Sequence, residues 1–155
     1  MTTDRLALER VGVARARAIV AGDYSGVRRG RGWPHADTVD GLRAFDVDAA
    51  ADDETGWLVT LRESGEVIGD CGWKGAADGA RSVEIGYGIA APYRGRGYAT
   101  EAVGALVEWT LAQPGVTVVV AEVEATNIAS RRLLERLGFA VQNTAGAFVY
   151  YARSA

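Results

Sequence analysis

Cysteine, histidine and lysine each occur only once in this chain of 155 residues, as Cys71, His35 and Lys74. A single cysteine excludes an internal disulfide, which fits a reducing cytoplasm. One cysteine and one histidine also cannot supply a Cys/His metal cluster. With lysine almost absent, arginine carries nearly all of the positive charge. That content fits either phosphate binding by guanidinium groups or a composition bias of the source genome, and we favour the bias.

Long apolar runs are also missing, since runs such as residues 118–121 are far too short to cross a bilayer. The first ten residues contain four charges and no apolar core of a secretion signal. A net charge of −3 and a pI of about 5.2 argue against general binding to nucleic acid or an acidic membrane surface. We therefore expect a cytoplasmic protein that forms one domain over residues 1–155, without nucleic-acid or membrane partners.

The apolar pattern predicts a mixed α/β sheet with antiparallel hairpins first and a βαβ crossover late. Alternation of apolar residues indicates strands, and a period of 3.6 residues indicates helices. Strands are predicted at 4–11, 57–62, 66–73, 82–90, 116–123 and 148–152, and helices at 12–22, from about 38 onward, at 98–112 and between Asn127 and Gly138.

The tetrapeptide Arg-Gly-Arg-Gly occurs twice, at residues 29–32 and 94–97. The first copy precedes Trp33-Pro34, and a residue before proline favours extended backbone, so we expect an exposed loop there, with a share in an acceptor site as the alternative. The second copy lies between a predicted strand and the strongest predicted helix. Free N–H groups and the helix dipole make such a position suitable for an anion. A tight turn at a helix entry is the simpler alternative.

Two common phosphate-binding motifs do not fit the second copy. The pattern GxxxxGK[ST] is absent, and a dinucleotide fingerprint lacks its third glycine, because Thr100 stands there. An oxidoreductase would also need an acidic residue about twenty positions on, where residues 118–120 are all valine. We therefore discount a nicotinamide-binding enzyme.

The surroundings of the second copy carry a longer pattern. Arg94-x-x-Gly97-x-Ala99 opens the helix, and Asn127-x-x-Ser130 and then 137–139 (Leu-Gly-Phe) follow. This combination resembles the GNAT superfamily of acyl-CoA N-acyltransferases, whose Q/R-x-x-G-x-G/A signature forms the pyrophosphate cradle. With 84–87 (Glu-Ile-Gly-Tyr) before the cradle, the chain is most similar to the RimJ/RimL-like branch of ribosomal-protein N-terminal acetyltransferases. The resemblance covers residues 4–152.

The resemblance implies a GNAT-like fold, in which a central, mostly antiparallel sheet has splayed fourth and fifth strands and is flanked by helices. It implies acetyl-CoA as cosubstrate, no metal, and acetyl transfer to a primary amine by direct attack in a ternary complex. The amine would belong to a peptide or protein N-terminus or to a small molecule, and a homodimer is compatible with the family. The implied acetyl-CoA contacts are Ile89, Ala90, Ala91, Arg94, Gly95, Arg96, Gly97, Tyr98, Ala99, Thr100, Asn127 and Ser130, with a backbone N–H near Ile89 as the donor to the carbonyl oxygen.

Glu84 and Glu122 are the candidate bases for the amine. Glu84 shares a strand face with Gly86 and Gly88, which leaves that face hollow, and Glu122 stands where some family members have their base. Either glutamate can instead be an ordinary solvated strand residue. Glu124, on the same face as Glu122, is interpreted as solvated.

Ser130 is the candidate proton donor for the leaving thiolate. The tyrosine that many family members use is replaced here by Leu134. The alternatives are that Ser130 only satisfies a backbone group in the first helical turn and that Asn127 is only an N-cap. The missing tyrosine also keeps open a catalytically weak CoA-binding module as the alternative function.

Three other residues have chemical potential but little supporting pattern. His35 can line the acceptor pocket, although a lone loop histidine is more often incidental. Cys71 is interpreted as a small core residue. Asp70 faces either a cationic acceptor or solvent.

Overall fold

The computed structural model describes residues 1–48, 56–77 and 81–155. Its elements, in chain order, are β1 (Leu6–Arg10), α1 (Val13–Val20), α2 (Ala36–Asp48), β2 (Gly56–Leu61), β3 (Val67–Ala77), β4 (Ser82–Ile89), the 3₁₀-helix η1 (Ala91–Tyr93), α3 (Tyr98–Leu111), β5 (Val118–Glu124), α4 (Ile128–Arg136), β6 (Ala140–Ala145) and β7 (Phe148–Ser154). None of the helices within these ranges combines the length and apolarity that crossing a membrane requires.

Seven strands form one sheet in the order β1-β2-β3-β4-β5-β7-β6. Every neighbouring pair is antiparallel except β4 and β5, which are parallel and are joined by the crossover through α3. The predicted mixed α/β sheet, with hairpins first and a crossover late, is confirmed.

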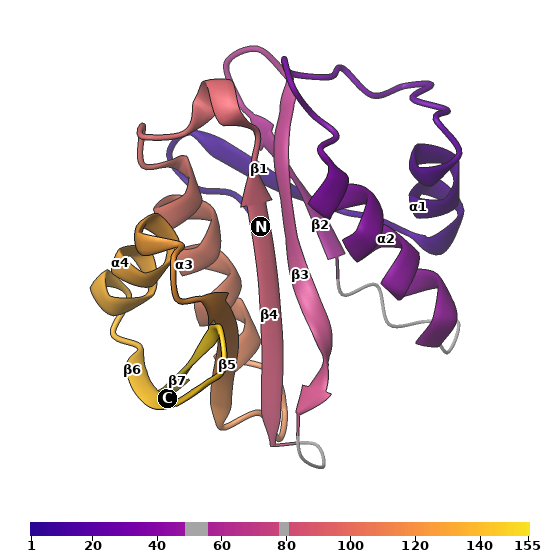
Figure 1. Cartoon of the computed structure of the whole chain (residues 1–155). Coiled ribbons are helices and arrows are strands. Elements are labelled where there is room, and N and C mark those ends of the chain that lie inside the picture. Colours follow the sequence, from indigo (N-terminus) through magenta and orange to yellow (C-terminus); the bar gives the residue numbers. More distant parts are fainter. Residues whose placement is uncertain (49–55, 78–80) are drawn as a thin grey trace.

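The β4 and β5 strands separate after a short paired segment. Ser82–Glu84 pairs with Val118–Val120, and beyond this point β4 continues to Ile89 and β5 to Glu124 without pairing to each other. Figure 1 shows the two strands close at one end and apart at the other. Continuing the paired register would set Glu122 level with Gly86 and Glu124 level with Gly88. The splayed fourth and fifth strands that the resemblance implied are therefore present.

Helices cover both faces of the sheet (Figure 1). α3 buries one stripe of residues against one face of the sheet, namely Ala102, Val103, Leu106, Val107 and Thr110. α1 and α2 cover the other face, where Ile19, Trp33 and Leu58 belong to a second, smaller core. Along β4, Val83 and Ile85 belong to the larger core on the α3 side. The alternation of a strand therefore turns Glu84, Gly86 and Gly88 toward the α1–α2 side.

The prediction omitted β6, an edge strand that pairs only with β7. All six of its residues are exposed, so it has no buried face and shows no apolar alternation. β1 is also shorter than predicted, at Leu6–Arg10. Cys71 is buried in the larger core, which confirms its interpretation as a core residue.

Candidate active site

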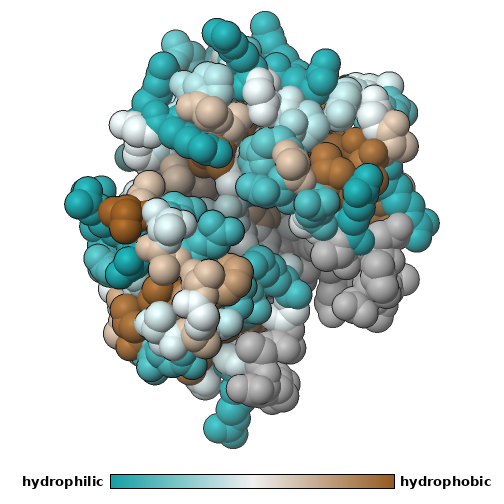
Figure 2. Space-filling model, viewed as in Figure 1, coloured by the Kyte–Doolittle hydropathy of each residue, from teal (hydrophilic) through white to brown (hydrophobic). Residues whose placement is uncertain are grey.

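A cleft of about 1400 Å³ lies beside the separated parts of β4 and β5. Residues from α2, β2, β3, β4 and β5 line it, together with the start of α4. Figure 2 shows the molecule hollowed between its α3–α4 side and its α1–α2 side. Four of the predicted site residues meet in this cleft: Glu84, Glu122, Asn127 and Ser130.

The second Arg-Gly-Arg-Gly segment forms the turn that begins α3. Gly95 and Gly97 adopt the left-handed conformation, with φ of 74° and 82°, which glycine reaches without strain. The first helical hydrogen bond runs from Glu101 N–H to the Gly97 carbonyl at 3.1 Å. The N–H groups of residues 98–100 therefore precede the helical ladder and are available to an acceptor.

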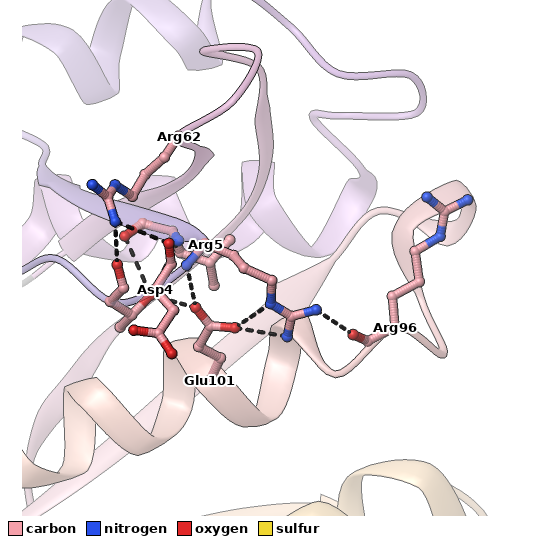
Figure 3. A network of polar contacts seen from close by, with 7 residues as sticks. Asp4, Arg5, Arg62, Arg96 and Glu101 are labelled. Atoms are coloured by element: carbon pink, nitrogen blue, oxygen red, sulfur yellow. Dashed lines mark hydrogen bonds and ion pairs between the residues drawn. The ribbon is translucent and has the colours of Figure 1, made fainter.

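An ion-pair network missed by the sequence reasoning fixes this turn (Figure 3). The Arg5 guanidinium donates to Glu101 at 2.7 Å and to the Arg96 carbonyl at 2.9 Å. Thr3 also donates to Glu101, at 2.6 Å. Burial alone would raise the pKa of Glu101, but the hydrogen bonds from Thr3 and Arg5 and the charge of Arg5 hold it below its ordinary value. The partners lie more than ninety positions apart in the chain, and no local pattern signals such a pair.

The Arg94 side chain makes a structural hydrogen bond within the protein, which a residue that only binds phosphate would not make. Its Nε donates to the Ile89 carbonyl at 2.7 Å, so the side chain holds the end of β4 to the turn. The first Arg-Gly-Arg-Gly copy is a loop, as predicted. There the Gly30 N–H donates to the Val67 carbonyl at 2.8 Å, and Arg29 and Arg31 are exposed.

The end of β4 presents backbone donors to the opening. Ala90 N–H donates to the Ile68 carbonyl on the β3 side at 2.8 Å. Since successive N–H groups of a strand point to opposite edges, Ile89 N–H points toward the β5 side, where β4 has no partner.

Glu84 and Glu122 share the cleft but have different partners. Glu84 belongs to the last paired rung of β4 and β5, and Lys74 Nζ lies 3.3 Å from its Oε1. Glu122 lies beyond that rung, opposite Tyr150 of β7. A hydrogen bond to Glu122 raises the pKa of Tyr150, so this phenol keeps its proton and donates to the carboxylate.

A hydroxyl pair spans the opening between β4 and α4. Tyr87 Oη and Ser130 Oγ are 2.5 Å apart. Burial raises the pKa of Tyr87, which keeps the phenol protonated at neutral pH. Tyr87 alternates along β4 with the buried residues Val83, Ile85 and Ile89, so its position in the sequence is that of a core residue. Only its polar tip distinguishes it from a core residue.

Asn127 caps α4, as predicted, because its side-chain oxygen accepts a hydrogen bond from Ser130 N–H at 3.1 Å. Leu134, at the position of the family's tyrosine, is completely buried in the core. Leu134 therefore supplies no polar group here, and the paired hydroxyls of Ser130 and Tyr87 lie at the α4 side of the opening instead.

The face predicted to be hollow is occupied by side chains from other elements. A Cβ atom at Gly88 would lie 2.6 Å from the His35 ring, and one at Gly86 would lie 3.0 Å from the end of Lys74. His35 and Lys74 also line the cleft. The two glycines therefore provide room for these cationic or titratable side chains, because neither glycine has a Cβ.

The comparisons with known proteins agree with this geometry. The family model described as "Acetyltransferase (GNAT) domain" matches residues 5–140. YjdG of Bacillus subtilis, described as an uncharacterized N-acetyltransferase, is 24% identical over 160 residues, which cover 97% of this chain and 95% of YjdG. The chain belongs to the GNAT acetyltransferase family, of the RimJ/RimL type, and is an acetyl-CoA-dependent N-acetyltransferase.

Solved structures show the same fold. A chain from Bordetella pertussis, described as a GnaT-family acetyltransferase, is 26% identical, with a TM-score of 0.69 over 99% of this chain and 98% of that one. RimL, described as a ribosomal L7/L12 alpha-N-protein acetyltransferase in complex with coenzyme A, has a TM-score of 0.69 over 99% of this chain and 96% of its own. At 14% identity, RimL supports the fold alone.

Proposed function

We propose that the protein transfers the acetyl group of acetyl-CoA directly to a cationic primary amine while both substrates are bound. One observation carries this proposal: the opening between β4 and β5 joins a turn of free backbone N–H groups to an acidic cleft. The turn suits a phosphate-bearing donor substrate, and the cleft suits a positively charged acceptor.

The acetyl-CoA side is assigned from backbone geometry. The N–H groups of residues 95–100 would contact the pyrophosphate, with Arg96 nearby and Arg94 bracing the turn. Main-chain groups of residues 89–91 would contact the pantetheine arm. Ile89 N–H, which points into the opening, would stabilise negative charge on the carbonyl oxygen as the amine attacks.

The acceptor side is assigned from charge. Among the described residues that line the cleft, Lys74 is the only lysine or arginine, whereas six carry carboxylate side chains: Asp37, Asp40, Asp70, Glu84, Glu122 and Glu124. This excess of negative charge would attract an ammonium group and disfavour an anionic acceptor. A peptide N-terminus or a small amine fits this chemistry, as an alcohol does not.

The proton transfers are assigned to groups beside the opening. The acceptor ammonium loses one proton to Glu122 or Glu84, directly or through water, and its free lone pair attacks the thioester carbon. The C–S bond then breaks, the sulfur takes the electron pair, and the nitrogen passes its second proton to water or, through the Ser130 hydroxyl, to the sulfur. Ser130, hydrogen-bonded to Tyr87, would donate to the leaving sulfur. Because a thiol has a pKa near 8.5, a hydrogen bond there suffices at neutral pH.

The first test is ligand-dependent stability. Acetyl-CoA at a concentration of 100 times its Kd should add about 2.7 kcal/mol to the free energy of unfolding, because it binds only the folded chain. Thermal unfolding measured with acetyl-CoA, NAD and ATP should show the largest shift with acetyl-CoA. No shift with acetyl-CoA, or a larger shift with NAD, would contradict the donor assignment.

Turnover separates the enzyme from a catalytically weak CoA-binding module, the alternative that the buried Leu134 at the tyrosine position keeps open. Release of free thiol from acetyl-CoA should depend on added amine. A protein that is stabilised by acetyl-CoA and yet releases no thiol with any amine would be the binding module.

A pair of glycine substitutions tests whether His35 contacts the acceptor amine in the cleft. Gly88→Ala should raise the KM for the amine several-fold, because its Cβ would lie 2.6 Å from the His35 ring and displace it. Gly86→Ala is the matched control, since its Cβ meets only the flexible Lys74 side chain, at 3.0 Å or more. Steady-state kinetics on both variants should show unchanged affinity for acetyl-CoA. Equal KM values for Gly88→Ala and Gly86→Ala would show that His35 does not contact the acceptor.

A further inference from the structure

Asp70 is a carboxylate of the cleft that the proposed mechanism does not yet use. It lies on β3 between Leu58 of β2 and Gly88 of β4. Leu58 belongs to the smaller core under α1 and α2, so the Asp70 side chain is on the same side of the sheet as α2. It lines the cleft beside the β4 residue that precedes Ile89.

The two oxygens of Asp70 have different surroundings. Oδ2 accepts hydrogen bonds from Trp33 Nε1 at 3.0 Å and from Thr38 Oγ1 at 2.5 Å. Trp33 and Thr38 are almost fully buried, so both donors are fixed in place. Within the described part of the chain, no group donates a hydrogen bond to Oδ1. Oδ1 is also not a buried atom without a partner, because Thr60 Oγ1 is the only such side-chain atom among the described residues. Oδ1 is therefore open to the cleft.

The electrostatic surroundings of Asp70 favour the binding of a cation at Oδ1. Burial raises the pKa of Asp70, and the bonds from Thr38 and Trp33 and the charge of His35 offset only part of that cost. Asp37, on the first turn of α2, adds repulsion. A carboxylate with one saturated and one free oxygen in such a site gains from an ammonium donor, because charge-assisted hydrogen bonds are the strong ones.

The surrounding contacts fix where that donor would sit. The ring of His35 rests over Gly88, and Thr38 Oγ1 lies 3.3 Å from the ring nitrogens of His35 while it donates to Asp70. These contacts form a wall next to Ile89. A nitrogen bound at Oδ1 would therefore be close to the point where Ile89 N–H faces the opening.

We propose that Asp70 is the residue that selects and orients the acceptor, by accepting a hydrogen bond at Oδ1 from the reacting ammonium group. This inference rests on the proposed function and specifies its substrate class: a primary amine that reaches the site protonated. One N–H stays bound to Asp70 after another proton leaves, which aims the lone pair at the acetyl carbon. Trp33 and Thr38 act as positioning residues, because they hold Oδ2 and thereby turn Oδ1 toward the cleft.

Asp70→Asn tests the inference. The side-chain oxygen of asparagine can keep the bonds from Trp33 and Thr38, whereas its NH₂ group would face the cleft as a donor and repel the ammonium. We expect the KM for a cationic amine to rise by about tenfold to a hundredfold, the range for a lost hydrogen bond to a charged group. The kcat should change less, and affinity for acetyl-CoA should stay unchanged.

Two controls separate recognition from structural damage. Glu63→Gln makes the same change of charge on an exposed residue that is not among the lining residues of the cleft, and it should change KM by less than about threefold, as expected for a weakly held surface charge. Hydroxylamine, a nucleophile that is uncharged at neutral pH, should lose little rate in Asp70→Asn. A purely structural role would lower the rates with both nucleophiles equally.

The outcomes are distinct. Wild-type kinetics in Asp70→Asn, or equal losses with the ammonium acceptor and with hydroxylamine, would overturn the inference and leave the proposed function standing. Wild-type protein that acetylates no amine would overturn the proposed function and this inference together. If Asp70→Asn does not fold, Trp33→Phe removes one donor to Oδ2 and should reduce the preference for the charged acceptor several-fold. An unchanged preference in Trp33→Phe would then reject the inference.

Discussion

Gly97→Val should reduce the affinity for acetyl-CoA by at least a hundredfold while leaving a folded protein. Gly97 has a φ of 82° and stands immediately before α3. A branched side chain here would cover the N–H groups of residues 98–100 and would press against Arg5 Nη2, which lies 3.2 Å from a Cβ at this position. If the phosphate cannot approach these N–H groups, it loses several charge-assisted hydrogen bonds at once.

Gly138→Val is the matched control for backbone strain. Gly138 follows α4 with the same φ of 82°, and a Cβ there makes only ordinary contact with Arg153, at 3.9 Å. Both variants should lose about 1–2 kcal/mol of stability from the left-handed conformation. Calorimetric titration with acetyl-CoA should find near-normal affinity only in Gly138→Val. If Gly97→Val also binds normally, the turn is a helix entry and nothing more.

Glu122→Gln should lower the rate at neutral pH by at least tenfold, within the usual range for a lost general base. Glutamine keeps the size of the side chain and can still accept the Tyr150 hydrogen bond, but it cannot take a proton. Glu84→Gln should have a smaller effect, because Glu84 sits at the closed end of the opening and pairs with Lys74 at 3.3 Å. Affinity for acetyl-CoA should barely change in either variant.

The loss in Glu122→Gln should shrink as pH rises. An acceptor ammonium has a pKa of about 8 at a peptide N-terminus and about 10.4 in a lysine, so free amine becomes available without help at high pH. The measurement is a pH–rate profile of wild type and both variants with amines of different pKa. Profiles like that of wild type in both variants would leave water as the proton acceptor. A larger loss in Glu84→Gln than in Glu122→Gln would reverse the assignment.

Sequence reasoning succeeded where one short segment carries the whole signal. The stripe on α3 and the alternation on β4 arise within single elements, since each face meets one consistent environment. The turn before α3 was predicted because glycine spacing and a helix start are both local features. Prediction from sequence failed at β6, whose exposed residues carry no pattern. It also failed at the face above Gly86 and Gly88, which was expected to be hollow but holds the side chains of Lys74 and His35.

By itself, the sequence determined the order of the elements other than β6, the parallel crossover through α3, the glycine turn that begins α3 and the resemblance to the GNAT family. Only the tertiary structure decided which side chains meet in the cleft. His35 over Gly88, Trp33 and Thr38 on Asp70, Tyr87 against Ser130, and Arg5 on Glu101 all join residues from different elements. Such pairs have no fixed spacing in the chain, because they are set by how strands align and helices pack.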